Sequence, residues 1–93
     1  MIVGTLVVEI HLGAVFSLKE KRQVVRSVID RIKQRFNVSV AEIGQQEEHR
    51  WAVIGIACLA NATNHVDRQL DHVLDFLEKD GRFSLAQIEK EIR

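Results

Sequence analysis

Apolar and polar residues alternate from Ile2 to Leu12, the pattern of a β-strand with one buried face. Ile2, Leu6, Val8, Ile10 and Leu12 fall on one side of this segment. Val3, Thr5, Val7, Glu9 and His11 fall on the other, which is therefore only half apolar. We expect a strand whose first face lies in the core and whose second face keeps two valines uncovered.

From Ser17 to Phe36 the apolar residues recur every three or four positions, as on one face of an α-helix. They are Leu18, Val25, Ile29, Ile32 and Phe36, with Val24 and Val28 widening the stripe. Ser17 followed three residues later by Glu20 forms a capping box at the start. The segment is predicted to be a helix lying on a sheet.

Four further elements follow in the chain. Residues 37–43 are rich in β-branched residues and predict a second strand, joined by the polar hairpin loop 44–50 to a third strand at 51–60. The third strand contains no charged residue, which is typical of a strand covered on both faces. A second helix is predicted to begin at Asn64, with Asp67 in the reciprocal capping position. Residues 82–92 predict a last strand, with a bulge or an exposed edge near Gln87, where the inward face switches.

The resulting β-α-β-β-α-β order, in a chain of 93 residues, predicts one domain spanning residues 1–93. Right-handed crossovers place the strands in a four-stranded antiparallel sheet of order 4-1-3-2, with two helices on one face. The predicted fold class is therefore α+β, a ferredoxin-like βαββαβ sandwich. Nothing in the chain covers the other face of the sheet.

That uncovered face is predicted to be apolar, and an apolar patch of several hundred Å² usually marks an interface. The residues expected to form it are Val3, Val7, Trp51, Ile54 and Ile56. Self-association is the simplest cover, so we expect a homodimer that stacks sheet on sheet about a twofold axis. The alternative is a small patch tolerated in a monomer.

Charge is concentrated locally although Lys plus Arg and Asp plus Glu number 13 each. The helix at 17–36 carries seven basic residues against Glu20 and Asp30. At roughly 100° per residue, Lys19, Arg22, Arg26 and Lys33 lie within about 60° of arc. We predict that Lys19, Lys21, Arg22, Arg26 and Lys33 contact RNA phosphates or an acidic protein surface. The alternative is a solvated flank that keeps a small protein soluble.

Other chemistry finds little support in the sequence. His65 and His72 lack a third metal ligand, and Cys58 in an apolar run fits a packed small hydrophobe better than a nucleophile. We therefore predict no metal, no cofactor and no catalytic residue. A single cysteine, with neither a signal peptide nor a membrane-spanning run, predicts a cytoplasmic protein without membrane contact.

Three segments carry a family resemblance: Ser17-Leu18-Lys19-Glu20-Lys21-Arg22, Arg35-Phe36-Asn37-Val38-Ser39-Val40-Ala41-Glu42, and Val66-Asp67. Together they resemble the YlxP-like family of small bacterial proteins, over essentially the whole chain. The resemblance implies a ferredoxin-like fold and a bacterial cytoplasmic protein, in a family classed as a domain of unknown function. Its genes often sit among transcription and translation factors, which implies work with RNA or the ribosome by association only.

These observations favour a non-enzymatic binding module that self-associates through its open sheet and contacts RNA or a ribosome-associated partner through its basic helix. The second hypothesis is a purely protein–protein or structural module, in which the basic helix pairs with the acidic second helix of a neighbour. The third is a small-molecule or catalytic site in the loop at 13–16. Acylphosphatase, a ferredoxin-like enzyme, uses an Arg in that loop, and none is present here.

Overall fold

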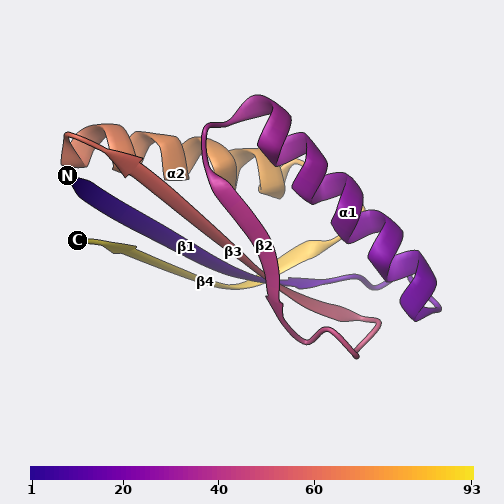
Figure 1. Ribbon diagram of the computed structural model, residues 1–93. Helices are drawn as coiled ribbons and strands as arrows, with labels where there is room; N and C mark the ends of the chain where they lie inside the picture. The colour runs from indigo at the N-terminus through magenta and orange to yellow at the C-terminus, as the bar shows by residue number, and fades with distance from the viewer.

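The structure contains the six predicted elements in the predicted order. This computed structural model describes all residues, 1–93. The elements are β1 (Ile2–His11), α1 (Leu18–Arg35), β2 (Ser39–Gly44), β3 (Trp51–Ala60), α2 (Thr63–Glu78) and β4 (Ser84–Ile92). The strands form one sheet in the order β2-β3-β1-β4, with antiparallel neighbours throughout. Both helices lie on the same side of the sheet (Figure 1). The ferredoxin-like prediction is confirmed.

The hydrophobic core fills the space between this sheet and the two helices. Alternate residues of β1 and β3 point into it, because side chains of a strand alternate between its two faces. The buried set comprises Leu6, Val8 and Ile10 from β1, Ala52, Ile54, Ile56 and Cys58 from β3, Val25, Val28 and Ile32 from α1, and Val66, Leu70, Val73 and Leu77 from α2. The two central strands therefore supply the floor of the core.

The start of α1 follows the predicted cap. Ser17 precedes the helix with an extended backbone, and its hydroxyl accepts a hydrogen bond from the backbone N–H of Glu20 at 3.1 Å. The Glu20 carboxylate accepts from the N–H of Phe16 at 3.3 Å. The backbone N–H groups of Phe16, before the helix, and Glu20, in its first turn, are thus hydrogen-bonded to side-chain oxygens, as the start of a helix requires.

The predicted cap of α2 is wrong. The helix begins at Thr63, its N-cap is Ala62, and no side chain completes the cap. The carbonyl of Ala62 accepts from the N–H of Val66, so the first turn closes before Asn64 can serve as a cap. The Asp67 carboxylate instead accepts from the ammonium group of Lys90 on β4, at 2.7 Å. A tertiary ion pair has replaced the expected local contact.

The bulge expected in the last strand is confirmed. The pairing of β1 with β4 shifts between Glu9 and Ile10, leaving Ala86 as the extra residue beside Gln87. Beyond the bulge, Lys90 points towards the helices, whereas Glu89 and Glu91 point to the open side of the sheet. This shift decides which charges reach the uncovered face.

Candidate nucleic-acid interface

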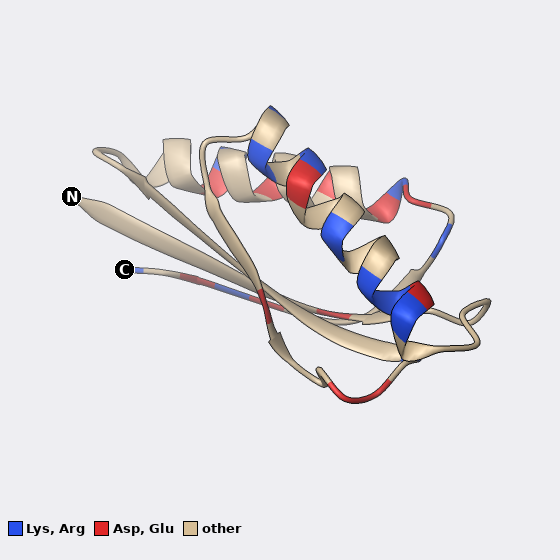
Figure 2. Ribbon diagram, turned by 45° about the vertical axis from the view of Figure 1, so that its right-hand side comes forward, with Lys and Arg blue, Asp and Glu red and all other residues tan.

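Four of the five predicted binding cations lie on the outer surface of α1. Lys19, Arg22, Arg26 and Lys33 are all exposed, and we call this set the basic stripe. From Lys19 to Lys33 the stripe extends along about 21 Å of helix, at about 1.5 Å per residue. Figure 2 shows Lys and Arg positions recurring along α1. The helix thus presents its charge as a line.

No member of the basic stripe is held by a carboxylate of its own chain. The ion pairs of the structure involve Lys21, His49, Arg82, Lys90 and Arg93 as the cationic partners. Asp30, also exposed, lies about 20° beyond this arc at roughly 100° per residue, and it is the acidic residue nearest to the stripe. The stripe therefore has a cationic excess whose charge is free to meet an external anion.

Lys21, the fifth predicted cation, is unavailable for binding, and this part of the prediction is wrong. Its side chain is fully buried. The ammonium group donates to the carbonyls of Gln45 and Glu48, at 2.5 and 2.6 Å. It also forms an ion pair with Glu42 Oε2 at 3.0 Å, and this buried oxygen accepts no hydrogen bond. Position 21 falls on the inward side of the helix, where the β2–β3 hairpin encloses it.

The open sheet face contains three of the five residues predicted for self-association. Val3, Val7 and Trp51 are half-buried and point away from the helices. Ile54 and Ile56 are buried against the helices, so they belong to the core and their assignment to this face is wrong. Side chains alternate along a strand, and Trp51 and Ile54, three residues apart, cannot share a face.

The residues that take their place follow the same alternation. The alternate residues of β3 point to the same face as Trp51; they are Val53, Gly55, Ala57 and Leu59. Ile43 projects from the bulge in β2 beside Gly55. Leu59 and Ile43 are 60% and 54% exposed. Counting strictly in twos from Trp51 would have found the β3 residues from the sequence. Ile43 depended on the bulge, which the sequence did not indicate.

Acidic residues bound the open face on one side only. Glu89 and Glu91 lie on β4, opposite Val7 and Thr5 of β1, and Glu9 lies on β1 itself. The opposite edge, β2, presents Ser39 and Ala41 on this face. The open face is thus apolar over β3 and β1, acidic along β4 and uncharged along β2.

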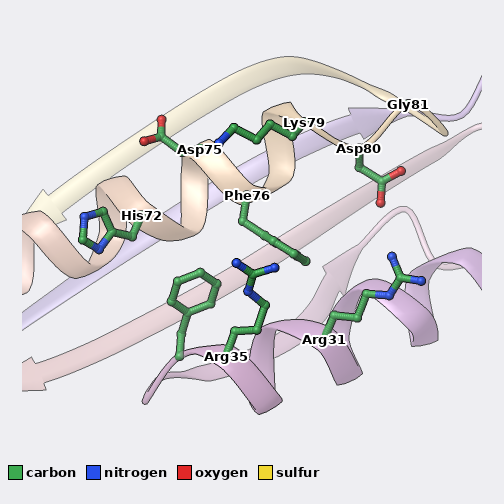
Figure 3. A pocket seen from close by; sticks show the side chains of 9 residues that line it. Arg31, Arg35, His72, Asp75, Phe76, Lys79, Asp80 and Gly81 are labelled. Carbon is green, nitrogen blue, oxygen red and sulfur yellow. The ribbon is translucent and has the colours of Figure 1, made fainter.

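A cleft between the C-terminal halves of α1 and α2 contains further cations. Arg35 of α1 and Phe76 of α2 point towards each other (Figure 3), with the guanidinium carbon 4.9 Å from the ring centre. Arg31, Lys79 and His72 also line the cleft. The C-terminal end of a helix dipole is negative. Cations near that end compensate the negative charge, and the dipole itself disfavours binding of an anion there. We therefore interpret the cleft as a helix–helix contact.

The carboxylate of Asp80, at the rim of this cleft, is already occupied. It accepts from Arg82 Nε and Nη2 at 2.9 and 2.6 Å. These hydrogen bonds from the guanidinium hold the pKa of the Asp80 carboxyl below its ordinary value. Arg82 also donates to the Ser27 hydroxyl of α1 at 3.3 Å. The pair links the turn before β4 to the first helix.

The loop at 13–16 and the single cysteine offer no assembled chemistry. Val15 is buried whereas Phe16 is 78% exposed. Cys58 is buried, and that burial raises the pKa of its thiol, which lowers its reactivity as a nucleophile. No group of three or more His, Cys, Asp or Glu side chains is placed to hold a metal ion. No helix is long and apolar enough to cross a membrane.

Comparison with known proteins bears on the whole chain. Residues 3–90 match the family described as "Protein of unknown function (DUF503)". The chain belongs to this family. It is also 36% identical, over 76 residues, to a protein of Bacillus subtilis (strain 168) named "Uncharacterized protein YlxP". That alignment covers 82% of this chain and 77% of the relative. The resemblance to YlxP-like proteins is confirmed, and neither name assigns an activity to the family.

Proposed function

We propose that this protein is a non-enzymatic module that binds RNA of the translation apparatus through the basic stripe of α1, and that it self-associates through the open sheet face. The observation that carries the RNA proposal is that all four stripe cations are exposed and none is paired with a carboxylate of the chain. Unpaired surface cations in a line suit a phosphate backbone, whose charges also repeat along a line.

The proposal concerns the RNA backbone rather than its bases. RNA-binding domains of this topology stack bases on aromatic residues of their two central strands. On the open face β1 has no Phe, Tyr or Trp, and β3 has only Trp51. The Trp51 ring already packs against His11, with ring centres 4.6 Å apart. Charge, and not stacking, is therefore the available means of contact.

The alternative is a protein–protein module in which α1 pairs with the acidic outer surface of α2 from a neighbour. One observation counts against it. Asp67 and Asp71, two of the carboxylates on that surface, are bridged within the chain by Lys90. Their charge is partly neutralised before any neighbour approaches. The proposal places the protein in the bacterial cytoplasm, in keeping with a single free thiol.

The test is binding of a fluorescently labelled RNA hairpin, measured by anisotropy at several salt concentrations. With four phosphate contacts, log K should fall with log salt with a slope of roughly −3 to −4. A variant with Lys19, Arg22, Arg26 and Lys33 all changed to Gln should lose most of the affinity and flatten that slope by about three.

A matched control changes Arg50, Arg68, Lys79 and Arg93 to Gln, which removes the same charge from outside the stripe. This control should keep the slope and most of the affinity. Equal losses in the two variants would show that only net charge matters, and would contradict a defined site. No binding by the wild type at about 50 mM salt refutes RNA binding. Binding of polyglutamate but not RNA supports the protein–protein alternative.

A further inference from the structure

The side chains of the open face form rows that cross all four strands, because each strand pairs in register with its neighbour. One row runs Ala41, Gly55, Val7 and Glu89, from β2 through β3 and β1 to β4. The next row runs Ser39, Ala57, Thr5 and Glu91. In both rows the β4 end is a glutamate and the β2 end is a small uncharged residue.

The side chains of the open face also project to different heights above the sheet. Gly55 has no side chain, but Ile43 packs over it, since a Cβ at Gly55 would lie 3.0 Å from Ile43 Cδ1. A shallow depression of about 290 Å³ lies beside this contact, bordered by Thr5, Ala41 and Ala57 among others. Val7, the neighbour of Gly55 in the row, projects from β1 with its side chain half-buried. Val7 of β1 and Ile43 of β2 therefore both border the depression as apolar side chains.

In a dimer that stacks open face on open face with the two sheets aligned, the twofold axis lies in the plane of contact, either across the strands or along them. An axis across the strands sets β4 over β4 of the second copy, so that Glu89 and Glu91 meet their own counterparts. Glu91 is paired with Arg93 of its own chain at 2.7 Å, but Glu89 is in no ion pair, and like charges facing one another across an interface are destabilising. An axis along the strands sets β4 over β2, so that Glu89 faces Ala41 and Glu91 faces Ser39. It also sets Val7 over Gly55 and the Ile43 side chain that packs on it, which is an apolar contact.

We propose that two copies of this chain stack open face to open face about a twofold axis parallel to the strands, with β1 over β3 and β4 over β2 of the other copy. This inference rests on the self-association proposed above and adds its geometry. The charge of Glu89 selects this axis, and the apolar contact of Val7 with Ile43 is compatible with it. Packed sheets cross at about 30°, so close contact centres on the two rows described. Glu9, two residues beyond Val7, limits the contact at the hairpin end.

The available surface is adequate for such a dimer. Strands of ten residues at about 3.3 Å per residue, in a sheet about 19 Å wide, present roughly 600 Å² in projection. Side-chain relief makes the accessible area larger. A standard interface buries about 800 Å² per partner. A second copy therefore fits this face in extent.

The first arm of the test is sedimentation equilibrium, which should give twice the chain mass for the wild type at about 100 µM, where even weak dimers form. Val7→Glu, at the centre of the face, should give a monomer with unchanged far-ultraviolet circular dichroism. Asn64→Glu adds the same charge on the exposed start of α2 and should remain a dimer. A wild-type monomer refutes self-association and this inference together, while the RNA measurement stands on its own.

The second arm is a double-mutant cycle between positions 41 and 89, read as dimer dissociation constants. Ala41→Glu should weaken the dimer about tenfold, because each new carboxylate faces Glu89 of the other copy. Adding Glu89→Lys to the same chain should restore the affinity. Within one chain these positions lie three strands apart, about 14 Å, beyond the Debye length of about 8 Å at physiological salt.

The cycle separates the two axes. If Glu89→Gln tightens the dimer about tenfold, because it removes the repulsion between the two copies of Glu89, and Glu89→Lys shows no coupling to position 41, β4 lies over β4. That result overturns the axis along the strands and leaves self-association intact. Coupling of fivefold or more between positions 41 and 89 supports the axis along the strands. A dimer that changes in none of these variants overturns the stacked geometry, because contact through another surface is then required.

Discussion

The ammonium group of Lys21 connects α1 to the β2–β3 hairpin. It satisfies the carbonyls of Gln45 and Glu48 and neutralises Glu42, all from a fully buried position. Gln45 adopts a left-handed backbone, with φ of 61°, at the point where the hairpin turns. A non-glycine residue there carries some strain, and the hydrogen bond to its carbonyl helps to hold the turn.

Replacing Lys21 should therefore destabilise the fold. Lys21→Met should cost about 3 kcal/mol, because it leaves the Glu42 carboxylate without its ion-pair partner and two carbonyls without their donor. Lys19→Met, two residues away and on the exposed side of the helix, should change stability by less than about 0.5 kcal/mol. Urea denaturation measures both. Adding Glu42→Leu to Lys21→Met should recover part of the loss, and equal stability of the wild type and Lys21→Met would contradict the role given to this lysine.

Gly4 of β1 is a position where α2 approaches the sheet closely. A Cβ atom there would lie 2.2 Å from Val66 Cγ1 and 2.9 Å from Leu70 Cδ1. Both side chains are fully buried, so neither can move away freely.

Gly4→Ala should consequently lower the free energy of unfolding by about 1–3 kcal/mol, the usual cost of overpacking a core. Gly81→Ala is the control, because a Cβ at Gly81 meets no atom within 4 Å and the backbone there does not have a positive φ. It should be neutral or slightly stabilising. Thermal unfolding of the two variants distinguishes a packing effect from a general effect of replacing glycine.

At the scale of elements, the Asp80–Arg82 pair fixes the connection between α2 and β4 and reaches Ser27 on α1. Because the pKa of Asp80 is lowered in the folded state, its carboxylate stabilises the fold above the unfolded pKa of about 3.9. That contribution is lost as the pH falls through the lower, folded-state pKa. Stability falls on acidification because the unfolded state, with the higher Asp80 pKa, binds the proton more tightly.

Asp80→Asn should thus lower stability by about 1 kcal/mol at pH 7, since Arg82 is partly solvated. The difference from the wild type should shrink steadily as the pH falls below about 4. Asp75→Asn, an exposed carboxylate without an ion pair, should differ little from the wild type throughout. Urea denaturation across this pH range gives the comparison. A wild-type advantage that grows on acidification would contradict the assignment.

The basic stripe and the open face are opposite surfaces of the same molecule. Figures 1 and 2 show α1, which carries the stripe, on one side of the sheet. The open face points away from the helices and is therefore the other side. A dimer stacked through the open faces therefore leaves both copies of α1 on its outside. RNA binding through the basic stripe and self-association through the open face therefore use different surfaces and can occur together.

Whole-molecule stability should accordingly depend on concentration. If the folded chain dimerises and the unfolded chain does not, raising the protein from about 5 to about 200 µM should raise Tm by a few degrees. Val7→Glu should show a Tm that does not change with concentration. Differential scanning calorimetry at matched ionic strength makes the measurement. A wild-type Tm that is independent of concentration would contradict self-association at these concentrations.

The sequence by itself determined the order of elements, their approximate bounds and the layer they form. These follow from local periodicity: alternation gave β1 and its two faces, and the three- and four-residue spacing gave α1 and its exposed cations. The identities of Lys19, Arg22, Arg26 and Lys33 as surface residues were available for the same reason. Each depends only on neighbours a few positions away.

The tertiary structure alone decided what depended on distant parts of the chain. Lys21 looks like one more cation of a basic helix until the hairpin, 24 residues later, closes over it. Asp67 looks like a cap until Lys90 reaches it from the last strand. The rows of the open face, with glutamates at one end and small residues at the other, exist only once four strands are in register. Burial and pairing are properties of contacts between elements, and no local pattern specifies them.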